Sequence, residues 1–330
     1  MPNAKISGIG FFVPPKVMTN EDLSQFMDTN DEWIQERTGI QERRYVENGV
    51  STSDLAIPAV EMAMDNAGLE KGDIGLIIFA TSTPDYYAPG SGCLLQEKMK
   101  FPTIGALDIR VQCSGFVYGL SVAQQYIENS IFKHVLVIGS EVQSTAMDLS
   151  TRGRDTAVIF GDGAGAVVVS ASKDDSGILS THLHSDGAYA KELWVEAPSS
   201  GISPRLNQEI LDDGKHFLKM NGREVFRHAV TRFPEVIIES LDSNGFSSED
   251  IDLLVPHQAN IRIAQMIQKR LGLRDNQIYS NIHKYGNTTA ASVPIALCEA
   301  VNENKVKKGD LVVLAAFGSG FTWASAILRW

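Results

Sequence analysis

The strongest constraint on the fold is an order of segments that occurs twice along the 330 residues. In the first half, residues 52–68 carry apolar side chains at helical spacing and end at a glycine. Residues 73–83 (DIGLIIFATST) follow, with an apolar run that suits a strand buried on both faces. In the second half, residues 225–244 and 250–260 (DIDLLVPHQAN) repeat this helix and strand.

Each half then continues with a further helix and a second buried strand. Helical patterns cover residues 113–129 and 287–302, and residues 134–139 (HVLVIG) and 310–320 (DLVVLAAFGSG) supply the strands. Alternating strands and helices favour mostly parallel sheets covered by helices on both faces. We therefore predict a layered α/β protein with a pseudo-twofold axis.

Other segments add detail to this plan. We predict a first strand at residues 5–12 and a helix at 259–271. In FGDGAGAVVV a strand, not a helix, follows the glycines, so a tight hairpin with strands at 157–160 and 165–170 is favoured over a nucleotide-binding loop. Residues 185–220 have little periodicity, and a long loop of this kind is typical of a binding segment.

Composition limits the location and partners of the chain. Hydrophobic residues make up 43%, charged residues 21%, and the net charge is −11, which disfavours a broad surface for nucleic acid or an anionic membrane. No apolar run reaches membrane-spanning length, and the N-terminal residues lack the pattern of a signal peptide. The chain has three cysteines and no CxxC pair, so neither a disulfide framework nor a structural metal is expected. The lack of a disulfide framework predicts a cytoplasmic protein.

Two residues suggest chemistry by their position. Cys113 follows a strand that ends near Val111 and precedes a helix, so we expect the helix dipole to lower the pKa of its thiol. His257 directly follows a buried strand, where ligands bind in open α/β sheets. Taken alone, Cys113 is better explained as a small buried apolar residue.

Asn287 occupies the position in the second half that Cys113 occupies in the first, so two equivalent helix starts are predicted to face one pocket. A Gly-Asn turn is also commonly structural. The glycines of FGSGFTW, residues 317–323, permit close approach of a ligand to the backbone. His182 and His184 alternate on one strand with no third metal ligand in view, which favours a polar strand face.

Seven segments in order carry a family resemblance: DTNDEWIQERTGI, QCSGF, RGRDTAVIFGDGAGA, STHLHSDG, LLVPHQAN, YGNTTAASVP and AAFGSGFTW. From about residue 4 to Trp330 the chain resembles the β-ketoacyl-acyl-carrier-protein synthase III family. The resemblance implies a thiolase-like fold, in which two duplicated α/β halves form a five-layer α-β-α-β-α architecture. The halves would be residues 1–174, with the nucleophilic cysteine, and 175–330, with the histidine and asparagine.

The resemblance also implies a reaction. The thiolate of Cys113 attacks an acyl-CoA and becomes acylated. Neutral His257 and the Asn287 amide then stabilise the enolate formed when a malonyl thioester on acyl carrier protein loses carbon dioxide. The carbanion attacks the acyl-enzyme in a decarboxylative Claisen condensation. Backbone N–H groups of Cys113 and Ser319 match the oxyanion hole, and no cofactor or metal is implied.

The binding residues implied by the resemblance lie outside this set. Trp33, Arg37 and Arg152 match residues that hold the coenzyme A nucleotide, and Asn260 matches one lining the pantetheine arm. A basic surface that docks acyl carrier protein is matched by Arg262, with Arg227 and Lys269. The family forms homodimers, so a homodimer is expected.

The sequence departs from the family pattern at three places. Arg110 and Gln112 replace small residues before the nucleophile, so Gln112 either hydrogen-bonds near the acyl group or packs at the dimer interface. Ala88 stands where an aromatic residue caps the acyl pocket, which predicts medium or long acyl primers unless Tyr86 or Tyr87 refills the space. Ser319 replaces a glycine but keeps its backbone donor.

Other functions stay open at this point. The same scaffold serves head-to-head acyl-CoA condensation and secondary-metabolite synthases, which change the second substrate. Cys113 and His257 also suit an acyl-thioester hydrolase, whereas a protease is disfavoured by the full motif series. A binding homologue without activity is disfavoured by the intact Cys113, His257 and Asn287.

Overall fold

The computed structural model describes residues 3–330, which form two principal β-sheets. The first has the order β1-β7-β6-β4-β5, with bounds Ala4–Phe12, Gly163–Ala171, His134–Glu141, Leu76–Ala80 and Gly105–Ile109. The second has the order β11-β12-β13-β8, with bounds Leu253–Pro256, Leu311–Gly318, Thr322–Arg329 and Gly177–Ser185.

Both sheets are mixed, so the prediction of mostly parallel sheets is wrong. β4 is parallel to β5 and β6, and β11 is parallel to β12. β7 runs antiparallel to β1 and β6, and β13 runs antiparallel to β12 and β8. The short connection between β12 and β13 leaves no room for a crossover helix and so imposes antiparallel pairing.

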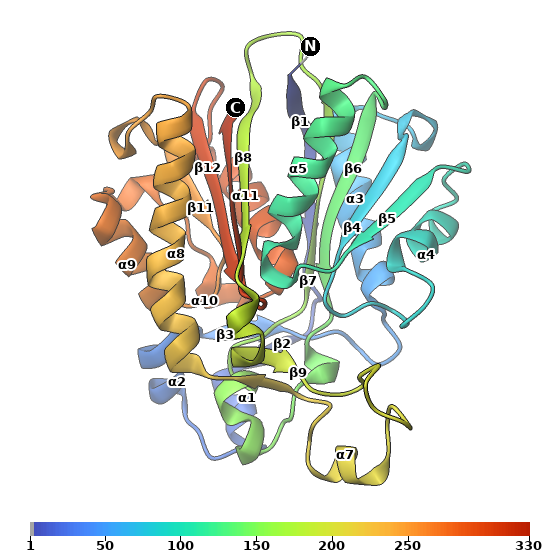
Figure 1. Ribbon diagram of the computed structural model, residues 1–330, viewed down its shortest axis with the longest axis vertical. Coiled ribbons are helices and arrows are strands. Elements are labelled where there is room, and N and C mark those ends of the chain that lie inside the picture. The colour runs from blue at the N-terminus through green and yellow to red at the C-terminus, as the bar shows by residue number, and fades with distance from the viewer. Residues whose placement is uncertain (1–2) are drawn as a thin grey trace.

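Helices cover and separate the sheets in five layers (Figure 1). α3 (Thr52–Ala67) and α4 (Ser91–Lys98) pack on the outer side of the first sheet. α5 (Gly115–Glu128) and α11 (Ser292–Asn302) lie between the two sheets. α8 (Gly222–Ser243) covers the second sheet, and α9 (Ile261–Leu271) packs beside α8.

The remaining elements gather at one end of the layers, at the bottom of Figure 1. They are β2 (Val17–Thr19), α1 (Asn20–Ser24), α2 (Asp31–Thr38), β3 (Glu42–Arg44), α6 (Arg154–Ala157), β9 (Leu193–Val195), α7 (Gln208–Asp212), β10 (Leu218–Met220) and α10 (Ile282–Tyr285). The weakly periodic segment 185–220 therefore contains a small antiparallel pair, β9 with β10. Within residues 3–330, no helix combines the length and apolar character needed to cross a membrane.

The hairpin predicted around the glycines of FGDGAGAVVV is absent from the described chain. α6 ends at Ala157, Phe160 forms only an isolated bridge with Asn287, and β7 begins at Gly163. The glycines instead permit close packing of β7 against α11. A Cβ atom at Gly165 would lie 2.7 Å from the Pro294 Cβ.

This contact predicts that Gly165→Ala destabilises the fold. The added methyl group would also lie 2.9 Å from the Ile295 backbone nitrogen, so α11 must shift. We expect a loss of about 1–3 kcal/mol, which is typical of an overpacked core. The midpoint of urea unfolding measures this loss, with Gly72→Ala as the control because a Cβ there meets nothing within 4 Å. Equal midpoints for the two variants would contradict the packing argument.

Candidate active site

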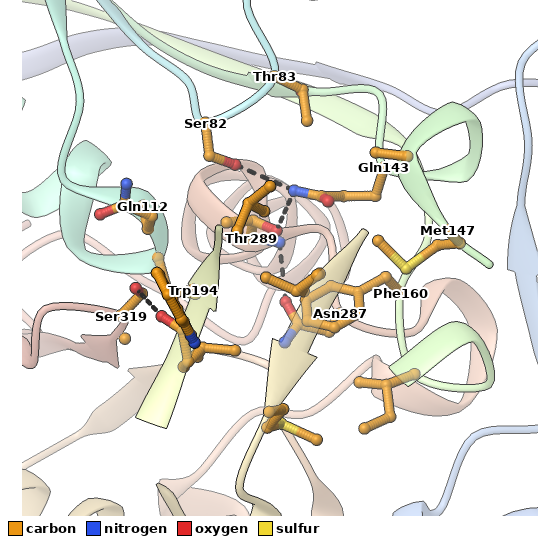
Figure 2. Close-up of a pocket in the computed structure, with 18 of the residues that line it drawn as sticks. Ser82, Thr83, Gln112, Gln143, Met147, Phe160, Trp194, Asn287, Thr289 and Ser319 are labelled. Atoms are coloured by element: carbon orange, nitrogen blue, oxygen red, sulfur yellow. Dashed lines mark hydrogen bonds between the residues drawn. The ribbon is translucent and has the colours of Figure 1, made fainter. Parts of the chain in front are cut away.

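One cavity of about 720 Å³ lies where the two halves meet. Cys113, His257 and Asn287 all line it, although they come from three separate parts of the chain. Residues of the 185–220 segment form another part of the wall, among them Leu193, Trp194 and Leu218. Figure 2 shows Gln112, Asn287 and Ser319 around this space.

The nucleophile candidate sits in a single 3-10 turn, Gln112–Ser114, between β5 and α5. The Cys113 side chain is buried, and the preceding Gln112 has φ +44°, in the left-handed region. The end of β12 packs directly on the cysteine: a Cβ atom at Gly318 would lie 2.7 Å from Cys113 Cβ and 3.0 Å from Sγ. Glycine is therefore required at position 318 for the strand to lie this close.

The pKa of the Cys113 thiol is set mainly by burial and not by the helix dipole. Burial raises the pKa of its thiol to about 12, and the nearby Glu141 carboxylate raises that pKa as well. Backbone N–H groups of Cys113 and Ser319 point at the sulfur and lower its pKa without offsetting the burial. The expectation of a lowered pKa is therefore wrong for the free protein, in which Cys113 is a thiol.

His257 is held as a neutral hydrogen-bond donor. Burial lowers the pKa of its imidazole to about 3, so the ring carries no charge near neutral pH. Its Nδ1 lies 2.5 Å from Ser292 Oγ, and Gln258 N–H donates to the same oxygen at 3.3 Å. Within residues 3–330 the Ser292 hydroxyl has no acceptor other than Nδ1. This assigns the ring proton to Nε2, which is then free to donate.

Asn287 is fixed by backbone contacts on both sides. Its N–H donates to Ile159 O at 2.9 Å, and Gly161 N–H donates to Asn287 O at 3.1 Å. Thr289 N–H donates to the side-chain Oδ1 at 2.8 Å (Figure 2). Because Oδ1 is thus occupied, the Nδ2 group is the part of the amide available to a ligand.

Together these groups place a buried thiol, two neutral side-chain donors and two backbone N–H groups near the sulfur in the wall of one cavity. The site suits a nucleophilic attack on a thioester followed by a step in which negative charge develops on oxygen.

Comparisons with known proteins agree with this chemistry. The family profile described as 3-Oxoacyl-[acyl-carrier-protein (ACP)] synthase III matches residues 107–187, and the profile of its C-terminal part matches residues 241–330. A protein named Beta-ketoacyl-[acyl-carrier-protein] synthase III from Caldanaerobacter subterraneus subsp. tengcongensis is 44% identical over 327 residues, covering 99% of this chain and 98% of that protein. A protein of the same name from Xanthomonas campestris pv. campestris is 45% identical with the same coverage. The crystal structure of 3-oxoacyl-[acyl-carrier-protein] synthase III from Aquifex aeolicus VF5 matches with a TM-score of 0.91 and 42% identity, covering 99% of this chain and all of that one.

This chain belongs to the β-ketoacyl-acyl-carrier-protein synthase III family. The resemblance carried by the sequence motifs is confirmed, as is the thiolase-like α/β fold. Family membership makes the chain a condensing enzyme of the acyltransferase type. The boundary expected between residues 174 and 175 falls in the connection from β7 to β8 and stays a prediction.

The residues matched to coenzyme A binding in this family are only partly at the cavity. Asn260 lines it, caps α9 and donates through Nδ2 to Arg37 O at 2.8 Å. Trp33 lies under the Arg37 guanidinium, with 4.7 Å between Cζ and the ring centre. Trp33, Arg37 and Arg152 do not line the cavity, and Arg152 is instead paired with Asp148 at 2.5 Å. Their nucleotide-binding role stays a prediction.

Of the two positions assigned to the acyl pocket, only Gln112 lines the cavity. Ala88 lies exposed in a surface loop and does not line the cavity of the single chain, so its place at the acyl pocket stays a prediction. Tyr86 and Tyr87 are also exposed, at 63% and 73%, and do not line that cavity. The neighbouring Pro84 and Asp85 are the part of this segment that lines the cavity.

The three residues matched to carrier-protein docking lie on neighbouring helices. Arg227 is on α8, and Arg262 and Lys269 are on α9. All three are exposed. Arg227 is already paired with Glu224, so its charge is partly neutralised. Docking at this face stays a prediction.

Sequence reasoning missed several residues that shape the site. Arg154 lies over the Trp33 ring at 4.7 Å, and it belongs to the RGRDT motif that was recognised only for Arg152. Glu141 is the last residue of the buried strand β6. Acidic residues are rarely buried, so its position in an apolar strand could have indicated a functional role. The sequence gave no indication that Ser292 contacts His257, because the two residues are 35 positions apart.

The raised pKa of Cys113 predicts slow alkylation near neutral pH. Because the thiolate is the reactive form, the rate of iodoacetamide labelling at Cys113 should rise about tenfold per pH unit from pH about 6 to 10. Exposed Cys93 serves as the internal control for access of the reagent. Peptide mass spectrometry measures both rates. A plateau for Cys113 below pH about 8 would instead indicate a lowered pKa.

Proposed function

We propose that this protein condenses an acyl-CoA with malonyl-acyl carrier protein through an acyl-Cys113 intermediate. The observation that carries the proposal is the presence of Cys113, neutral His257 and Asn287 in the wall of one cavity. Family membership supplies the substrate class.

In the first half-reaction, Cys113 Sγ attacks the thioester carbonyl carbon and the coenzyme A sulfur leaves. The proton lost by the Cys113 thiol ends on that sulfur, so the exchange of thioesters is balanced. Backbone N–H groups of Cys113 and Ser319 point at Sγ and are placed to donate to the oxyanion of the tetrahedral intermediate.

In the second half-reaction, the malonyl thioester loses carbon dioxide and the electron pair passes to its α-carbon and carbonyl oxygen. His257 Nε2–H and Asn287 Nδ2–H are the free donors that stabilise this enolate. The α-carbon attacks the acyl-enzyme carbonyl, the bond from that carbon to Sγ breaks, and the Cys113 thiolate takes a proton. A cationic histidine would protonate the enolate, so neutrality of His257 favours condensation.

Separate variants test the two half-reactions. With acyl-CoA alone, intact mass spectrometry should show an acyl adduct on the wild type and on His257→Ala, but not on Cys113→Ala. With malonyl-acyl carrier protein added, His257→Ala should form product about 10²–10³-fold more slowly, which is typical of losing one oxyanion donor.

The same assay separates the alternatives. Free acid released without carbon dioxide would identify a thioesterase, and condensation without malonyl-acyl carrier protein would identify head-to-head synthesis. A series of primers from acetyl- to dodecanoyl-CoA tests chain length. We propose primers longer than acetyl, because the cavity wall extends to residues 50–52 and 82–85. Best turnover with acetyl-CoA would contradict this.

A homodimer and a cytoplasmic location belong to the same proposal. β5 ends the first sheet with one unpaired edge, and its Leu107 is 39% exposed. An unpaired strand edge is suited to pairing with a second copy.

Light scattering should therefore give about twice the chain mass of 36.0 kDa. Leu107→Lys should weaken the dimer, because it puts a charge on the paired edge. Ile131→Lys, at an exposed position outside β5, is the matched control. A monomeric wild type, or equal effects of both variants, would argue against pairing at β5.

A further inference from the structure

The cavity has two walls of different character. The wall formed by the second half and the 185–220 segment is mainly apolar and includes Met220, Phe226 and Phe233. The wall formed by the first half, together with the turn after Asn287, carries amides and hydroxyls. Its uncharged polar members include Ser82, Thr83, Gln112, Gln143 and Thr289 (Figure 2), and the charged Asp85 and Arg110 line it as well.

Hydrogen bonds fix the orientation of the Gln143 amide. Its Nε2 donates to Ser82 Oγ at 3.0 Å and to Thr289 Oγ1 at 2.9 Å. The Ser82 hydroxyl donates its own hydrogen to Glu141 Oε2 at 2.8 Å, so Ser82 Oγ must accept from Gln143. The Gln143 amide is therefore oriented with Nε2 toward Ser82 and Thr289 and with Oε1 away from them.

The side-chain oxygen of Gln143, Oε1, can still accept a hydrogen bond. No donor among residues 3–330 bonds to Oε1, and this oxygen is not among the fully buried unpaired atoms of those residues. Gln143 itself is 95% buried and lines the cavity, so Oε1 is an acceptor open to the cavity.

This acceptor lies close to the catalytic residues. Thr289 accepts from Gln143 through its side chain and donates to Asn287 Oδ1 through its backbone N–H. Cys113 lines the same cavity, so an acyl group on its sulfur enters the space onto which this acceptor opens. Gln112 also lines the cavity, but it lies on the other side of Ser82 and Thr289 from Gln143 (Figure 2).

A saturated alkyl chain beside this oxygen would leave Gln143 Oε1 unpaired, which is the condition under which polar sites reject apolar analogues. A hydroxyl group satisfies Oε1, because it can donate a hydrogen bond to it. A keto oxygen only accepts, so it leaves Gln143 Oε1 unpaired.

We propose that the preferred primer is a hydroxyacyl thioester whose hydroxyl lies within a few carbons of the carbonyl, with Gln143 as the residue that selects it. This inference rests on the proposed acyl-Cys113 intermediate and specifies its substrate class.

The test compares the rates at which 3-hydroxybutyryl-CoA (each enantiomer), acetoacetyl-CoA and butyryl-CoA acylate Cys113, followed by intact mass. For the wild type we expect the better hydroxybutyryl enantiomer to react at least about tenfold faster than butyryl. In Gln143→Leu this ratio should fall about tenfold or more. Gln125→Leu makes the same substitution at an exposed position on α5 and should keep the wild-type ratio.

The outcomes are distinct. Equal or faster acylation by butyryl-CoA in the wild type overturns the inference and leaves the proposed function intact. Acetoacetyl-CoA as the fastest substrate overturns the assignment of a hydroxyl. An unchanged ratio in folded Gln143→Leu overturns the inference, and if that variant does not fold, Gln143→Met removes the same acceptor and gives the same test. No adduct from any of the thioesters would reject the proposed function itself.

Discussion

The close packing of α5 and α11 between the two sheets is the constraint on which the active site depends. β7 approaches α11 so closely that Gly165 has no room for a Cβ, and the end of β12 lies against Cys113 across Gly318. Because both helices are held in this middle layer, the turns that precede them meet at one point. One turn carries Cys113 and the other carries Asn287. The position of the chemistry is thus a consequence of how tightly the core is filled.

The same enclosure sets the protonation states. Burial raises the pKa of the Cys113 thiol and lowers that of the His257 imidazole, so the free site holds a neutral acid and a neutral base. Burial also raises the pKa of Glu141 to about 7, although Ser82 and Thr83 donate hydrogen bonds to its carboxylate. A site without fixed charge on its catalytic groups suits a reaction in which charge appears on the substrate only during catalysis.

Much of this arrangement is visible in the sequence, and the failures have specific causes. Periodicity and the repeated order predict the helices, the buried strands and the meeting of Cys113 with Asn287, because each follows from local pattern and symmetry. The grouping of His257 with these two residues comes from the family resemblance. The hairpin at residues 157–170 was predicted wrongly, since glycines needed for packing against α11 look like glycines needed for a turn. Periodicity also says nothing of a thiol pKa set by burial, or of the contact between Ser292 and His257.

The hydrogen bonds of Gln143 have a consequence for how such enzymes diverge. Its amide binds the Thr289 side chain, and the Thr289 backbone orients Asn287. A mutation of Gln143 that adapts the cavity to a new primer therefore also disturbs Asn287. Primer selectivity and turnover are thus expected to change together. Gln112 is not bonded in this way, and its side chain extends into the same cavity. In a lineage that acquires new primers, changes at position 112 are expected to precede changes at position 143.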